Sequence, residues 1–72
     1  MSTTERYSVT GMTCAHCVAA VTEEVGSIAG VSTVDIVLVV GGTSRVTVTS
    51  AGPLPVESVR DAIDEAGYVL SA

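Results

Sequence analysis

The first part of the chain changes from a strand-like to a helix-like pattern of apolar positions. Residues 7–10 alternate apolar and polar side chains before Gly11, which is typical of a short, half-buried strand. From residue 15 onward, apolar side chains recur every third or fourth position, which predicts an amphipathic helix. We expect Thr13 to cap its start, a left-handed Gly30 to close its end, and Gly26 to weaken its interior by about 1 kcal/mol relative to alanine. Its predicted buried face consists of Cys17, Val18, Val21, Val25 and Ile28.

The remaining chain predicts two more strands, a second helix and a short final strand. Residues 34–40 alternate with a high valine content, which predicts the longest strand. Residues 41–44 begin with two glycines and join this strand to an alternating run at 45–49, as in a hairpin. Helical spacing returns over residues 56–66 and ends at Gly67, and residues 68–70 form one short last strand. The apolar face of this second helix is predicted to hold Val56, Val59, Ala62, Ile63 and Ala66.

The predicted order of elements defines the fold class. Two right-handed βαβ units that share one sheet place both helices on the same face. We therefore predict an α+β protein with a ferredoxin-like βαββαβ sandwich, in which a four-stranded antiparallel sheet carries two helices on one face. Residues 1–72 leave room for one domain only.

Composition and charge narrow the classes of function. Hydrophobic residues make up 47% and charged residues 15%, a globular composition. The net charge is −5 and the three basic residues are all arginines, too few for a nucleic-acid-binding surface and without the lysines that favour anionic membranes. No apolar run approaches the roughly 20 residues of a spanning helix, and the start lacks a signal-peptide core. We expect a cytoplasmic protein with no nucleic-acid partner and no direct membrane insertion.

Acidic side chains dominate the exposed sides of the two predicted helices. We interpret them as a solvated face, with a docking surface for a basic partner as the alternative. They are Glu23, Glu24, Glu57, Asp61, Asp64 and Glu65.

The chemistry of this chain is expected at Cys14 and Cys17, which straddle the first strand-to-helix turn. A thiol at a helix start lies beside free backbone N–H groups and the positive end of the helix dipole. Both cysteine thiols should therefore be acidic and nucleophilic. At a spacing of i and i+3 the two sulfurs can converge on one soft ion. A closed zinc site needs four ligands, whereas Cu(I) accepts low coordination by thiolates, so we predict Cu(I).

The neighbouring residues have two interpretations each. His16 is either a third ligand or tuner of the thiolates, or a solvent-facing residue in a mobile loop, which we favour. Met12 is either a thioether ligand or, as we favour, an apolar side chain that anchors the loop in the core. The cysteine pair itself could instead be two small buried residues, or a thioredoxin-like redox pair, although Ala15 and His16 stand where proline is usual in that motif.

The sequence resembles the heavy-metal-associated domain family over nearly its whole length, most closely its bacterial copper chaperones of the CopZ type. The resemblance rests on the metal motif over residues 12–17, the helix run 18–21, the Gly30-Val31 junction and the segment 66–68. It implies Cu(I) held by Cys14 and Cys17 and no enzymatic activity. Tyr68 matches an aromatic position in the loop facing the metal, where it either covers the thiolates or belongs to the last strand.

The resemblance also implies partners. Copper would pass by ligand exchange to the metal-binding domain of a copper-transporting P-type ATPase or to a copper-sensing repressor, and copper could bridge a homodimer with His16 as an auxiliary ligand. Alternatives are the excised amino-terminal domain of such an ATPase, or a mercury- or zinc-binding relative. Eukaryotic members carry lysine at the Tyr68 position and a basic docking face, so their docking charges do not transfer to a chain without lysine.

Overall fold

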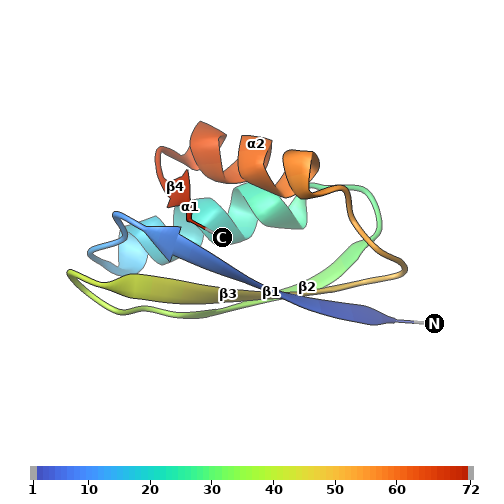
Figure 1. The fold of residues 1–72 in the computed structure, drawn as a ribbon, viewed down its shortest axis with the longest axis horizontal. Coiled ribbons are helices and arrows are strands. Elements are labelled where there is room, and N and C mark those ends of the chain that lie inside the picture. The colour runs from blue at the N-terminus through green and yellow to red at the C-terminus, as the bar shows by residue number, and fades with distance from the viewer. Residues whose placement is uncertain (1, 72) are drawn as a thin grey trace.

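The computed structural model describes residues 2–71, which form six elements in two layers. Both helices lie on one face of the sheet, and the opposite face carries no helix (Figure 1). The elements are β1 (Thr3–Thr10), α1 (Ala15–Gly26), β2 (Val31–Val37), β3 (Thr43–Ser50), α2 (Val56–Ala66) and β4 (Val69–Leu70).

The sheet has the order β2-β3-β1-β4, and all its pairings are antiparallel. β1 and β3 pair along their full lengths, from Thr3 opposite Ser50 to Thr10 opposite Thr43. The short β4 joins the other side of β1, with Leu70 opposite Val9. The predicted ferredoxin-like βαββαβ architecture is therefore confirmed.

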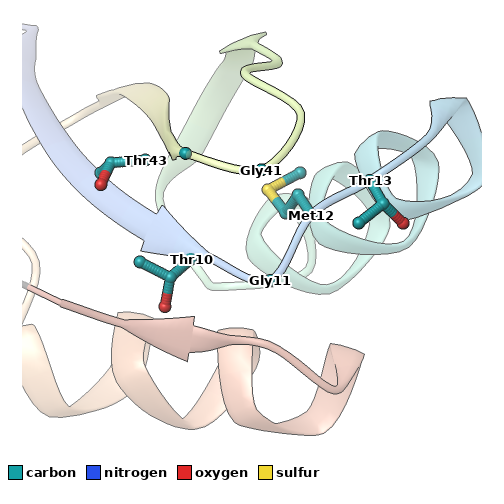
Figure 2. Close-up of a pocket in the computed structure, with 7 residues that line it drawn as sticks. Thr10, Gly11, Met12, Thr13, Gly41 and Thr43 are labelled. Atoms are coloured by element: carbon teal, nitrogen blue, oxygen red, sulfur yellow. The ribbon is translucent and has the colours of Figure 1, made fainter.

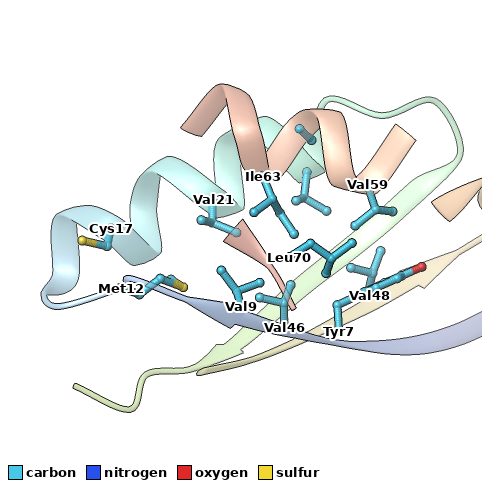
Figure 3. Close-up of a cluster of buried hydrophobic side chains, with 12 residues drawn as sticks. Tyr7, Val9, Met12, Cys17, Val21, Val46, Val48, Val59, Ile63 and Leu70 are labelled. Carbon is cyan, nitrogen blue, oxygen red and sulfur yellow. The ribbon is translucent and has the colours of Figure 1, made fainter. Parts of the chain in front are cut away.

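One apolar cluster fills the space between the sheet and the helices (Figure 3). Alternate residues of the central strands point toward the helices, and the helix faces predicted from the three- and four-residue spacing point back. Burial of these side chains is the main stabilising contribution in a domain of this size. The largest apolar members with essentially no exposed surface are Met12, Ile63, Val9, Val21, Val25, Val46, Val48 and Val59.

The second strand differs from its prediction. β2 covers Val31–Val37 rather than 34–40, and its seven residues make it shorter than β1 and β3, which have eight each. The apolar tract continues into the turn, where the Val39 N–H donates to Ser44 Oγ at 2.9 Å. Gly41 adopts a left-handed φ of 76°, as the glycine-led turn predicted. β2 therefore ends early, because the residues after it form hydrogen bonds within the turn.

The ends of the first helix also differ. Cys14, not Thr13, is the N-cap of α1, and no side chain makes a capping hydrogen bond there. Gly26 is the last helical residue rather than an interior one, and Ser27 forms the C-cap, with its Oγ donating to the Glu23 carbonyl at 2.8 Å. Gly30 is left-handed, with φ of 92°, but it lies in the turn before β2.

The second helix and first strand match their predictions more closely. Gly67 caps α2 with a left-handed φ of 96°, and Tyr68 N–H closes the end by donating to the Ile63 carbonyl at 3.0 Å. Val56 was predicted to face the core, yet it is 49% exposed because it begins the helix. β1 starts four residues before the predicted segment, where it pairs with the end of β3. Within residues 2–71 no helix combines the length and apolarity needed to cross a membrane.

The two helix-end glycines predict opposite effects of alanine. Gly67→Ala should lower the free energy of unfolding by about 1–2 kcal/mol, because an L-residue is strained at φ of 96°. Gly26→Ala should raise it by up to about 1 kcal/mol, because a Cβ there meets no atom within 4 Å and alanine lowers the entropy of the unfolded chain. Urea unfolding of the two variants measures both changes, and equal signs would contradict the assignment.

Candidate metal centre

Two residues fix the conformation of the turn that leads from β1 to the cysteines. Gly11 has a left-handed φ of 92°, and a Cβ at this position would lie 3.6 Å from the Tyr68 ring. Met12 is only 1% exposed and belongs to the core cluster, so it anchors the turn as the favoured interpretation expected. Figure 3 shows Met12 and Cys17 at the same end of this cluster. The turn therefore enters the helix from a buried, immobilised residue.

The two sulfurs lie together at the start of α1. Cys14 is exposed at the N-cap and Cys17 is buried in the first turn, and both are free thiols. Their Sγ atoms are 3.6 Å apart. Two bonds of about 2.3 Å, the length of a zinc–thiolate bond, can meet at one ion between them, and a straight S–metal–S arrangement requires the sulfurs to separate by about 1 Å more. Exposed Cys14 is the side chain with room for that movement.

Cys17 Sγ accepts a backbone N–H group that lies just before the helix. Counted from the N-cap Cys14, Cys17 is the third helical residue, the position whose side chain reaches back in a capping box. Its sulfur accepts the backbone N–H of Thr13 at 3.4 Å, and the Thr13 hydroxyl lies 3.8 Å away. Thr13 thus serves the site through its amide and hydroxyl instead of capping the helix.

These donors favour the ionised form of Cys17. The pKa of the Cys17 thiol falls from its ordinary value of 9.0 to about 6, first because of the Thr13 amide and then because of the Tyr68 hydroxyl. Burial opposes this shift, and the backbone and thiol of Cys14 add to it. The interaction with Cys17 is also the main reason that the pKa of Tyr68 is raised. The sequence predicted acidic thiols at this turn, and the surroundings of Cys17 act in that direction.

The other candidates lie around the thiol pair in different ways. His16 is exposed on the first turn of α1, so it is solvent-facing, although it belongs to the helix and not to a loop. Tyr68 is half-buried and comes from the turn between α2 and β4. In the described residues 2–71, no three His, Cys, Asp or Glu side chains gather as a ligand set. The donor atoms that the fold brings together are the two sulfurs.

A hollow of about 390 Å³ lies beside the turn and was not expected from the sequence (Figure 2). It separates the β1–α1 turn from the β2–β3 turn, and its lining comes from residues 10–13 and 41–43. Threonines, glycines and Met12 form its lining. The antiparallel hairpin brings the glycine turn to this end of the sheet, and sequence patterning gives no measure of the space left between two turns.

The Tyr68 contact predicts a pH-dependent thiol. In reduced, metal-free protein, one thiolate should appear with a midpoint near pH 6, and Tyr68→Phe should move that midpoint upward because the phenol no longer donates to Cys17. Thiolate absorbance followed against pH measures the midpoint. Tyr7→Phe is the matched control, because Tyr7 is buried in the core cluster and its loss should leave the midpoint in place.

The same shift links folding to pH. Between about pH 6 and 9 the folded protein binds fewer protons at Cys17 than the unfolded chain does, so this group makes the protein more stable as pH rises. The stabilisation that Cys17 contributes is complete above the pKa of its thiol in the unfolded chain. It is lost as the pH falls through the pKa of the thiol in the folded protein. In the thiolate titration, a midpoint of Tyr68→Phe equal to that of the unsubstituted protein would contradict the contribution of the Tyr68 hydroxyl.

Comparison with known proteins agrees with this fold. The chain is 43% identical over 61 residues to the copper chaperone CopZ of Bacillus subtilis, covering 83% of this chain and 84% of CopZ. Among solved structures, it superposes on a CopZ metallochaperone with a TM-score of 0.81, 33% identity and coverage of 94% and 98%. The N-terminal domain of ZntA gives a TM-score of 0.82 at 28% identity, with coverage of 97% and 90%. Residues 6–69 match the family model described as the heavy-metal-associated domain, and the chain belongs to that family.

Proposed function

We propose that this protein carries Cu(I) between Cys14 and Cys17 and delivers it to a partner by exchange of thiolate ligands. The observation that carries the proposal is the pair of free sulfurs 3.6 Å apart at a helix start, one exposed and one buried. Support comes from the similarity to a protein named copper chaperone CopZ and to a CopZ metallochaperone structure. Copper is here a cargo, and the protein carries out no covalent chemistry on a substrate.

The donor chemistry favours a soft ion. Thiolates select soft metals such as Cu(I), and the acidic Cys17 thiol supplies a thiolate at neutral pH, as metal binding requires. Zinc in a structural site takes four ligands, which this pair would have to complete from outside the chain. Two sulfurs therefore hold Cu(I) with its preferred ligands and leave it open to a third.

Exchange proceeds from the exposed side of the pair. An incoming thiolate from the partner adds to the copper, a three-thiolate intermediate forms, and Cys14 departs first because its side chain is exposed at the N-cap. Cys17 departs last because the Thr13 amide and the surrounding core hold its position. The partner receives Cu(I) as its second thiolate replaces Cys17.

The proposed acceptor is the metal-binding domain of a copper-transporting P-type ATPase or a copper-sensing repressor, met in the cytoplasm. Copper could also bridge two copies of this chain through the same sulfurs, with His16 as an auxiliary ligand. A redox role of the thioredoxin kind has less support, because the match to the heavy-metal-associated family covers residues 6–69.

A second candidate function is that of a metal-binding domain within a larger transport protein. The observation in its favour is the similarity to the N-terminal domain of ZntA, whose TM-score of 0.82 is close to the 0.81 of the CopZ structure. Such a domain would accept metal instead of carrying it between proteins. The N-terminal domain of ZntA and MerP have the same fold, so the identity of the metal is part of the test.

Serine at either cysteine should abolish tight Cu(I) binding. Cys14→Ser and Cys17→Ser each leave one thiolate, so the affinity in competition with a Cu(I) chelator should fall by at least about 100-fold. Met12→Leu is the matched control, because Met12 is buried in the core and leucine keeps its volume. Unchanged affinity in a serine variant would overturn the site, and lost affinity in Met12→Leu would make the thioether a ligand.

Competitive loading should identify the metal and its stoichiometry. Anaerobic protein offered Cu(I), Zn(II) and Hg(II) together should give one Cu(I) per chain, or one shared by two chains, by native mass spectrometry. Loaded protein mixed with the soluble metal-binding domain of a copper-exporting ATPase should then transfer the ion. Retention of copper in the presence of excess apo acceptor would contradict the carrier role and favour the acceptor role.

A further inference from the structure

β2 lies at an edge of the sheet and lacks lysine and proline, two residues that commonly protect an edge strand. The sheet order leaves its outer side without a partner strand among residues 2–71. Natural edge strands usually carry lysine, proline or several charges that prevent pairing with another chain. Residues 31–44 contain no proline and one charged side chain, Asp35.

The helix side of this edge is apolar along the strand, and the opposite side becomes apolar where the strand ends. Val34, Ile36 and Leu38 pack against the core from the helix side but stay half-buried. On the other face the exposed Thr33 and Asp35 are followed by Val37, which is 61% exposed. The segment after the strand exposes Val39 by 43% and Val40 by 66%. The end of this edge therefore exposes apolar surface that a further strand would cover.

We propose that the outer edge of β2 pairs antiparallel with β2 of a second copy, about a two-fold axis at Ile36. The proposal concerns the apo protein and does not depend on copper. The cysteines lie on the turn after β1, which is separated from β2 by β3, so the paired sheet leaves them accessible.

The pleat and the charges select this register. Opposed residues in an antiparallel pair share a face, so the axis must pass through a residue and not between two. An axis at Asp35 would place two carboxylates opposite each other, which is destabilising. An axis at Ile36 instead places Asp35 of each copy opposite Val37 of the other, and Val34 opposite Leu38.

This register also gives Asp35 a cation. Within each copy Val37 lies opposite Arg45 on β3, and both side chains are exposed. Asp35 of the second copy would then lie two strand spacings, about 10 Å, from Arg45 along one row of the sheet. The long arginine side chain can close much of that distance and pair with the carboxylate. The symmetry makes this ion pair twice, so the edges are complementary in charge as well as in apolar surface.

Sedimentation equilibrium of reduced, chelator-treated protein tests the pairing. We expect a monomer–dimer equilibrium whose dissociation constant rises at least about tenfold in Val37→Lys, because a lysine on each edge repels its neighbour and blocks the strand contact. Val69→Lys is the matched control, since Val69 is 59% exposed on β4 at the opposite edge. A protein that stays monomeric at all concentrations, or a dimer equally weakened by both lysines, would overturn the proposal.

Charge reversal tests the register. Asp35→Arg and Arg45→Asp should each weaken the dimer about fivefold to tenfold, since each removes two ion pairs, and the double variant should restore it. Both side chains are exposed, so the fold should be kept, and circular dichroism checks this. A double variant that dimerises no better than either single one would refute the axis at Ile36.

Discussion

The sulfur of Cys17 is held by the backbone amide of Thr13, and the arrangement of this end of the molecule depends on that contact. The same residue lies in the first turn of α1, belongs to the apolar cluster and contributes one of the two sulfurs of the candidate site. The Thr13 amide lies one residue before the N-cap, and the sulfur three residues into the helix reaches back to accept it. Structural and chemical roles therefore meet in one atom.

This overlap explains why the two cysteines differ. Cys14 follows Thr13 directly and stands at the N-cap, where nothing covers it. Cys17 points back over the turn and is enclosed by the core, with Met12 buried beneath the same loop. A pair of identical residues thus becomes one fixed and one movable donor through the geometry of a single helical turn.

Periodicity in the sequence predicted the order of the six elements and most of the core. Valine-rich alternation and helical spacing are strong signals, since each strand or helix must bury one side against the other layer. Boundaries were less predictable, because they depend on hydrogen bonds between distant residues. The Val39 N–H donates to Ser44 Oγ, so β2 ends early. β1 extends back to Thr3 because Thr3 pairs with Ser50 at the end of β3. Neither interaction can be recognised from the local sequence pattern.

The site was predictable only as far as its local motif. Spacing and position placed Cys14 and Cys17 at one helix start, and the burial of Met12 followed from its apolar character. The direction in which the Cys17 sulfur points was not predictable, so Thr13 was assigned to the wrong hydrogen bond. Tyr68 entered through a family resemblance, because its contact with Cys17 needs the docking of α2 and the Gly67 cap, which no local pattern encodes.

Cys17 and Tyr68 are far apart in the sequence, and this separation matters while the chain is being synthesised. A growing chain that has released its first half already holds both cysteines and the Thr13 amide, but Tyr68 stands near the end of the 72 residues. The phenol reaches Cys17 only after α2 has packed and its left-handed cap has turned the chain back toward the sheet. The part of the lowered Cys17 pKa that comes from Tyr68 therefore arises only when the end of the chain has folded.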